Sequence, residues 1–186
     1  KDSDPLREGR VDLETGVVES NTGPELRAQA LFRDHWIGVV RRGHPLSKGR
    51  VTPARYATGK HVSASRTDGG WIEALDAALR KLGYERDIVA LLAGGFATAI
   101  ALARASDLIA TVPARHTANL RDGMHSFELP VAMPEFTISM LWHPRFEADA
   151  AHRWLRECVR DVCAGELDAP PVRRGGRADG ARRRRR

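Results

Sequence analysis

The residues best suited to chemistry in this chain are hydroxyl groups, one arginine and two glycines, which gather in short segments directly after expected strands. Such hydroxyls, a guanidinium and free backbone N–H groups at helix starts can together hold a small anion such as a carboxylate. The candidate ligand-binding residues are Ser63, Ser65, Arg66, Thr67, Gly94, Gly95, Phe96, Thr98 and Thr111, together with Thr15 near the N-terminus. These residues predict a binding site for a small anionic molecule.

Plainer structural roles for some of these residues stay open at this point. Ser65 and Thr67 are equally suited to capping a following helix, because a side-chain oxygen there accepts a free backbone N–H. The pair Gly94 and Gly95 also suits the start of a helix without any ligand. Arg66 is as well suited to being a solvated loop charge.

The motifs of catalysis and of metal binding are missing from the sequence. It contains no GxSxG, P-loop or GxGxxG motif, and its seven histidines follow no HxH or HExxH spacing. We therefore expect binding rather than enzymatic turnover, with no metal and no cofactor. A site assembled from distant residues is the alternative that a sequence leaves open.

Strand and helix patterns alternate along the middle of the chain. The expected strands are 61–65, 88–92 and 108–112, and the expected helices are 71–82, 96–104 and 113–120, the last beginning at Pro113. Such alternation indicates an α/β fold with a parallel sheet. Since the carboxyl ends of parallel strands lie along one edge, the candidate residues of these segments should lie close together.

Extended segments on both sides of this region predict how the chain is divided. Residues 36–42 and 127–142 read as extended chain that leaves and re-enters a first lobe. We expect a first lobe from residues 1–42 and 127–164, incomplete at its N-terminal side, and a second lobe from 43–126. The two lobes would enclose a ligand cleft and be joined by two crossings.

The C-terminal helix is expected to be amphipathic. Asp149 is suited to cap its first turn. The apolar residues at three- and four-residue steps are Ala151, Trp154, Leu155, Cys158, Val159 and Val162, with Arg153, Arg156, Glu157 and Arg160 on the other side. This pattern predicts that the apolar stripe, including Trp154, is buried.

Charge is distributed unevenly along the chain. Residues 170–186 hold eight arginines and one aspartate, and the other residues carry 22 basic and 23 acidic side chains. The body thus lacks the net positive charge typical of DNA-binding surfaces. Residues 165–186 are expected to be a disordered Arg-rich tail, either without a specific partner or in non-specific contact with nucleic acid.

Cysteine use and hydropathy predict the compartment. Cys158 and Cys163 are too far apart on one helix for a disulfide, which suits a reducing environment. The sequence shows no leader and no apolar run long enough to span a membrane. We therefore expect a cytoplasmic protein without a membrane partner.

Several segments, in this order, resemble the effector-binding domain of LysR-type transcriptional regulators. The resemblance covers about residues 6–163. It is carried by Leu6-Arg-Glu-Gly-Arg-Val-Asp-Leu13, Phe32-Arg-Asp-His-Trp36, Gly43-His-Pro-Leu46, Ser106-Asp-Leu-Ile-Ala-Thr-Val-Pro113 and the closing Trp142-His-Pro-Arg145. Asp149-Ala150 departs from the Asp-Pro often found in the closing motif.

The resemblance implies a bacterial transcription factor that senses a small molecule between two lobes of a periplasmic-binding-protein-like fold. It also implies a homo-oligomer, and contact with promoter DNA only through an N-terminal winged helix-turn-helix that these residues do not include. The alternatives are a transport-type solute-binding module and an α/β enzyme with an unrecognised site.

Overall fold

The computed structural model describes residues 4–64, 70–92 and 95–165, which form two β-sheets with helices around them. The larger sheet has the order β5-β4-β6-β3-β7. Its strands are β3 (Trp36–Val40), β4 (Lys60–Ala64), β5 (Asp87–Leu92), β6 (Ile109–Pro113) and β7 (His125–Glu128). β4 runs parallel to β5 and β6, whereas β3 is antiparallel to β6 and β7. The expected parallel sheet is therefore present, with antiparallel strands added at one side.

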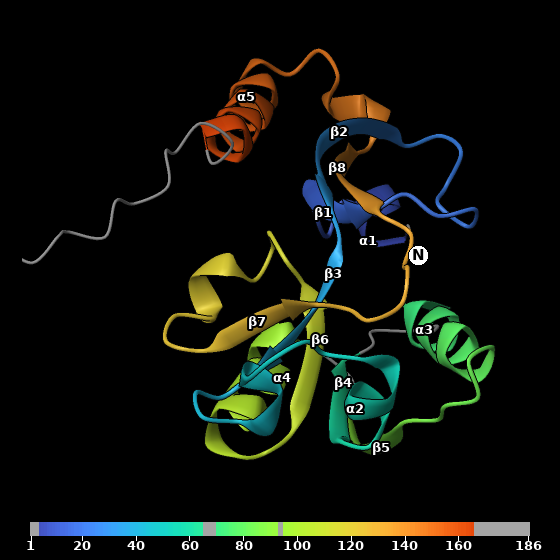
Figure 1. The fold of residues 1–186 in the computed structure, drawn as a ribbon. Coiled ribbons are helices and arrows are strands. Elements are labelled where there is room, and N and C mark those ends of the chain that lie inside the picture. Colours follow the sequence, from blue (N-terminus) through green and yellow to red (C-terminus); the bar gives the residue numbers. More distant parts are fainter. Residues whose placement is uncertain (1–3, 65–69, 93–94, 166–186) are drawn as a thin grey trace, which may run out of the picture.

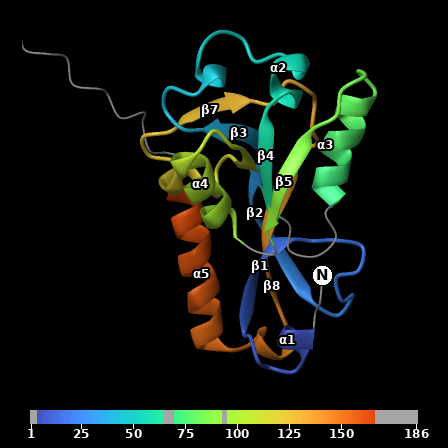
Figure 2. The same cartoon turned by 90° about the horizontal axis from the view of Figure 1, so that it is seen from below.

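Helices cover both faces of the larger sheet (Figure 2). They are α2 (Pro53–Ala57), α3 (Gly70–Arg80) and α4 (Phe96–Ala105), with short 3-10 helices at Pro45–Ser47 and Ala118–Leu120. α4 packs its buried Ala99, Ile100 and Ala103 on one face. α2 and α3 pack Tyr56, Leu75 and Leu79 on the other. This is the arrangement that crossover connections between parallel strands require.

The smaller sheet is antiparallel, with the order β1-β8-β2. Its strands are β1 (Leu13–Val17), β2 (Arg27–Asp34) and β8 (Phe136–Trp142), and α1 (Asp4–Arg7), a 3-10 helix at Pro144–Phe146 and α5 (Ala150–Gly165) accompany it. The central strand β8 comes from the far end of the chain. The smaller sheet is therefore built from both ends of the sequence, as Figure 1 shows by its blue and orange colours.

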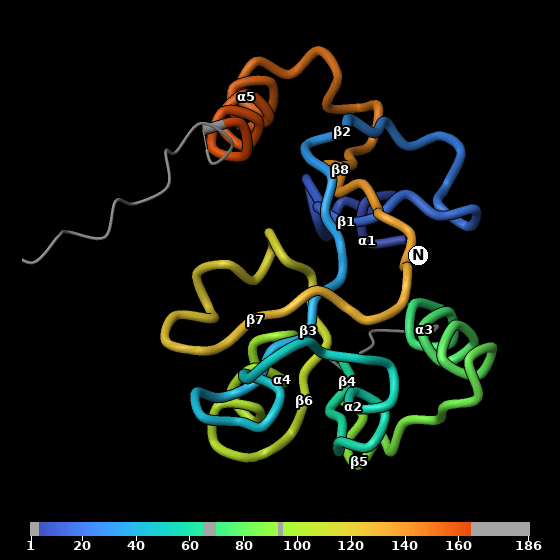
Figure 3. Tube along the Cα trace, viewed as in Figure 1, coloured from blue at the N-terminus to red at the C-terminus, as the bar shows by residue number. Residues whose placement is uncertain are grey.

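Two crossings join the sheets (Figure 3). The first is His35, between β2 and β3, and the second is the segment 129–135, between β7 and β8. The residue ranges expected for the two lobes placed β3 in the first lobe and divided β7 between the lobes at residue 127. Because the structure pairs both strands within the larger sheet, we propose the lobe boundary at His35 and within 129–135.

The first crossing is held by the carboxylate of Asp34, which is 2% exposed. One of its oxygens accepts hydrogen bonds from the backbone N–H groups of His35 and Arg115, both at 2.8 Å. The other oxygen accepts one from the backbone N–H of His116 at 2.9 Å. The backbone N–H of Ala114 also donates to the carbonyl oxygen of His35, at 2.8 Å. The end of β2 is thus bonded directly to the turn that follows β6.

These bonds explain why the helix expected from Pro113 to Leu120 is wrong. Pro113 instead ends β6 and pairs with Trp36 of β3. The following backbone is bound to Asp34 and His35, so the chain makes turns before the single 3-10 turn at Ala118–Leu120. The Pro113 signal was local, whereas the partners that override it lie about 80 residues away in the sequence.

The inward face of α5 also differs from expectation, although its start does not. Asp149 caps the helix by accepting the N–H of His152 at 2.7 Å. The buried residues are His152 and Arg156, 6% and 8% exposed, whereas Trp154 is 66% exposed. His152 bonds to the carbonyl oxygen of Asp12 and to Arg156, and the Arg156 guanidinium lies 4.6 Å from the Trp142 ring centroid. These two polar side chains can therefore be buried because both have partners, while Arg153, Glu157 and Arg160 stay exposed.

Candidate functional site

Four of the predicted site residues, Ser65, Arg66, Thr67 and Gly94, lie outside the described ranges. The remaining six fall into three groups: Ser63 and Thr111, then Gly95, Phe96 and Thr98, and finally Thr15. The first two groups belong to the larger sheet and its helix α4, and Thr15 belongs to the smaller sheet.

Ser63 and Thr111 come from the neighbouring parallel strands β4 and β6. The register pairs Val62 with Ala110, so these two hydroxyl-bearing residues lie one step further along their strands. Both residues are buried, and the Thr111 Oγ1 is 2.6 Å from the hydroxyl oxygen of Tyr56. Both side chains therefore lie in the protein interior, on the face of the sheet that α2 and α3 cover.

Gly95, Phe96 and Thr98 form the start of α4. Gly95 has a φ of +68°, a conformation that glycine adopts without strain. No side chain caps this helix, and Gly95 and Thr98 are exposed. An uncapped helix start offers backbone N–H groups and a partial positive charge.

Thr15 lies in the middle of β1, where it pairs with Met140 of β8. It is exposed and belongs to the smaller sheet. A molecule held at α4 and at Thr15 would therefore contact both sheets.

An aromatic cluster lies at the two crossings. The Trp36 ring stacks on Trp71 at the start of α3, with centroids 4.2 Å apart and planes at 18°. Phe136, the first residue of β8, and Phe96 lie 5.0 and 5.9 Å from Trp36. The cluster thus brings together the starts of β3, β8, α3 and α4. Sequence reasoning missed it, although Trp36 and Phe136 were recognisable as the first aromatic residues after each crossing.

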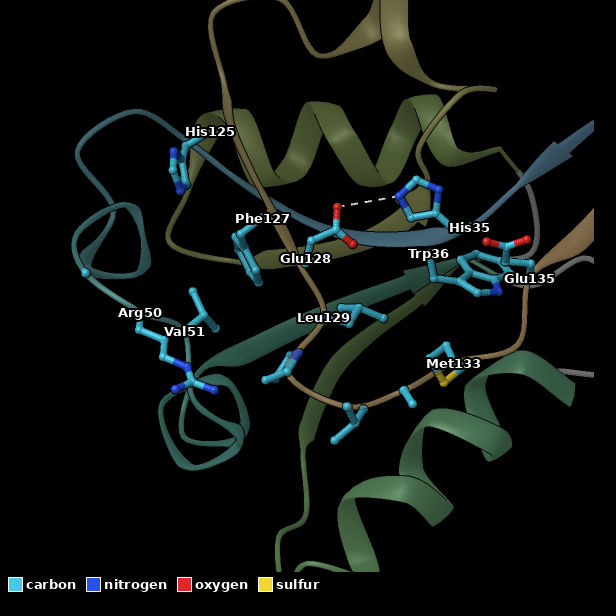
Figure 4. A pocket seen from close by; sticks show the side chains of 14 residues that line it. His35, Trp36, Arg50, Val51, His125, Phe127, Glu128, Leu129, Met133 and Glu135 are labelled. Atoms are coloured by element: carbon cyan, nitrogen blue, oxygen red, sulfur yellow. Dashed lines mark ion pairs between the residues drawn. The ribbon is translucent and has the colours of Figure 1, made fainter.

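A groove of about 820 Å³ borders both crossings on the side of β7. Figure 4 shows Phe127 and Leu129 between Val51 on one side and Met133 and Trp36 on the other. At its rim the His35 Nε2 lies 3.5 Å from a Glu128 oxygen, so one residue of each crossing region forms an exposed ion pair. The sequence held no signal for this groove, because its walls come from segments up to about 100 residues apart.

Metal binding and membrane insertion find no support in the part of the chain that the structure describes. No three His, Cys, Asp or Glu side chains group there so as to hold a metal ion. Over the same ranges, every helix is too short or too polar to cross a bilayer.

These features define a two-sheet α/β domain of the periplasmic-binding-protein-like class, with both crossings next to an aromatic cluster. The model of the LysR substrate binding domain matches residues 3–164, so the chain belongs to this family. The resemblance identified from the sequence is thereby confirmed.

Relatives support this assignment. The HTH-type transcriptional activator NahR of Pseudomonas putida is 30% identical over 159 residues, which are 84% of this chain and 52% of NahR. LinR of Sphingobium indicum, an HTH-type transcriptional regulator, is 28% identical over 87% of this chain and 54% of its own length. The chain thus spans about half the length of these curated relatives.

Solved structures agree in fold. A transcriptional regulator from Vibrio parahaemolyticus matches with a TM-score of 0.73 and 28% identity, covering 89% of this chain and 76% of that one. The effector binding domain of QuiR, solved in complex with shikimate, matches with a TM-score of 0.66 at 14% identity, covering 87% and 76%. At that identity the QuiR likeness describes the fold alone.

Proposed function

We propose that this chain is the effector-sensing part of a bacterial LysR-type transcription factor and that it binds a small anionic metabolite between its two sheets. The observation that carries this proposal is the architecture: two sheets joined by two crossings, with α4 of the larger sheet starting at the aromatic cluster where the crossings meet. Family membership places such a domain in regulators.

The anion would be held by the loops after β4 and β5. Supporting features are the exposed Thr98 and the start of α4 at Gly95, which has no side-chain cap. Arg66, predicted from the sequence alone, would supply the guanidinium. Thr15 would contact the ligand from the smaller sheet. The aromatic cluster would form an apolar wall of the same site.

Regulation would follow from differential binding. A ligand that contacts both sheets favours one relative arrangement of the lobes, and a ligand with equal affinity for all arrangements would shift nothing. In a homo-oligomer this shift would change how attached N-terminal DNA-binding modules meet a promoter. Under this proposal the protein acts in the cytoplasm, without catalysis and without a cofactor.

A thermal-shift screen of small carboxylates tests the proposal. We expect at least one to raise the melting temperature in a concentration-dependent way, because a ligand that binds only the folded state stabilises it by mass action. The substitution Arg66→Ala should weaken that binding at least tenfold, and Thr98→Val should weaken it less. The matched control is Arg42→Ala, an exposed arginine beyond the end of β3.

Two results would contradict this assignment. If Arg66→Ala and Arg42→Ala weakened ligand binding equally, the anion would not bind at the loop after β4. Chemical conversion of the bound carboxylate, detected by chromatography, would show that the domain is an enzyme and not a sensor.

A further inference from the structure

A fully buried arginine lies beneath α3. Arg86 precedes β5, and its side chain is 0% exposed. Its Nε donates to the carboxylate of Asp76 on α3 at 2.7 Å, which compensates the buried charge. Both terminal nitrogens, Nη1 and Nη2, are buried, and neither makes a hydrogen bond of normal geometry to a described residue. Burial raises the pKa of the Tyr56 hydroxyl and the nearby Arg86 opposes that rise, so the guanidinium also lies close to Tyr56. Buried N–H groups without a partner cost several kcal/mol in a protein interior, so they call for an explanation.

Two further buried polar atoms lie on the neighbouring strand β4. The Nε2 of His61 is 2.9 Å from the carbonyl oxygen of Tyr56. Because a carbonyl only accepts, Nε2 carries the proton and Nδ1 is left as an acceptor. This Nδ1 and the Oγ of Ser63 are both buried, and within the described ranges neither has a hydrogen-bond partner.

These groups belong to one cluster. His61 and Ser63 are two residues apart on a strand and thus share a face. The rings of His61 and Tyr56 are 4.6 Å apart, and the Tyr56 hydroxyl reaches Thr111. The register pairs Lys60 with Asp87 and His61 with Ile88, so Arg86 lies beside the start of the strand that carries His61. Burial and then the charge of Arg86 lower the pKa of His61 to about 4, so its ring is neutral.

The hydrogen-bond donors and acceptors of this cluster determine which small molecule or ion it can bind. The free guanidinium N–H groups need an acceptor, whereas the Nδ1 of a neutral His61 needs a donor. A halide ion would accept from Arg86 but would face the lone pair of His61, and Asp76 already compensates the positive charge. A metal ion would be repelled by the guanidinium. Water alone among these both accepts and donates.

We propose that Arg86, His61 and Ser63 form an internal water site in which an ordered water molecule accepts from Arg86 and donates to His61 Nδ1. This site is independent of the proposed effector cleft. It connects α3, which carries Trp71 of the aromatic cluster, to strands β4 and β5 through hydrogen bonds rather than apolar packing.

A crystal structure of the chain at about 1.5 Å resolution, with a parallel crystal soaked in bromide, tests this site. We expect a water molecule within hydrogen-bond distance (about 3 Å) of an Arg86 Nη and of His61 Nδ1. Anomalous bromide density at this point, or hydrogen bonds from the guanidinium to His61 or Ser63 in place of the water molecule, would overturn the proposal.

Nitrogen-15 NMR of histidine-labelled protein tests the same site in solution. We expect the His61 Nδ1 signal to be that of a hydrogen-bonded acceptor near neutral pH, and Arg86→Met to move it toward the value of an unbonded acceptor. The matched control Arg80→Met changes an exposed arginine on α3 and should leave the signal in place. A signal typical of an unbonded Nδ1 in the unmodified protein would contradict the proposal, whether or not Arg86→Met folds.

Discussion

The buried residue His61 makes the stability of the protein dependent on pH. Its pKa is about 4 in the folded state, and the ordinary value of 6.5 applies when the chain unfolds. Between these values the unfolded state binds more protons, so the free energy of unfolding should fall as the pH drops through that window. The total loss of unfolding free energy is on the order of 3 kcal/mol and is reached below both pKa values.

Urea unfolding at several pH values checks this prediction. His61→Gln retains an amide donor for the Tyr56 carbonyl but does not titrate, so its stability should vary less over the same window. Burial also lowers the pKa of His44, which adds a loss in the same direction. Equal slopes for the unmodified protein and His61→Gln would refute the assigned role.

Gly38 is required by close packing within the larger sheet. A Cβ at this position would lie 2.3 Å from two atoms of the Phe127 ring on the neighbouring strand β7. Gly38→Ala should therefore lower the free energy of unfolding by about 1–3 kcal/mol. The comparison is Gly70→Ala in α3, where a Cβ would meet no atom within 4 Å, and where alanine should be neutral or stabilising. Differential scanning calorimetry of both variants would measure the contrast.

At the scale of elements, the junction between β2 and the turn after β6 depends on Asp34. Asp34→Ala would leave three backbone N–H groups without their acceptor, and we expect a loss of about 3 kcal/mol in unfolding free energy. Glu128→Gln is the control, because Glu128 lies at the second crossing and its ion pair with His35 of the first crossing is exposed. A loss from Glu128→Gln as large as that from Asp34→Ala would mean that burial does not decide the strength of this junction.

The turn 114–117 also reaches α5. The Arg115 guanidinium lies 4.1 Å from the Phe32 ring centroid and donates to the carbonyl oxygen of Cys163. His116 meets Phe96 of the aromatic cluster edge to face. One turn therefore contacts β2, α5 and the start of α4.

At the scale of the whole molecule, an apolar flank of α5 is open to solvent. Trp154 and Val162 are 66% and 67% exposed, and Leu155 is 37% exposed. Such a patch favours association in water. We expect the chain to associate with increasing concentration and Trp154→Glu to reduce this, with stability changed by less than about 0.5 kcal/mol. Sedimentation velocity measures the association, and Arg153→Glu, which places the same side chain at an exposed residue of the charged flank, is the control.

Local signals in the sequence predicted much of the fold. Strand β8 lies within the segment expected to be extended, 127–142, and the ends of β4, α3, β5 and α4 were expected to within about two residues. The cap of α5 by Asp149 was also predicted. Periodicity, capping and turn chemistry act between neighbours in the sequence, so they can be recognised without the fold.

Only the tertiary structure decided which surfaces meet. It ended β6 at Pro113 through partners on β2, and it buried His152 and Arg156 of α5 because a carbonyl oxygen and an aromatic ring of other segments contact them. It likewise assembled the Trp36 cluster and buried Arg86 against Asp76. These contacts join residues far apart in the chain, and hydrogen bonds between distant groups leave no periodic pattern in the sequence itself.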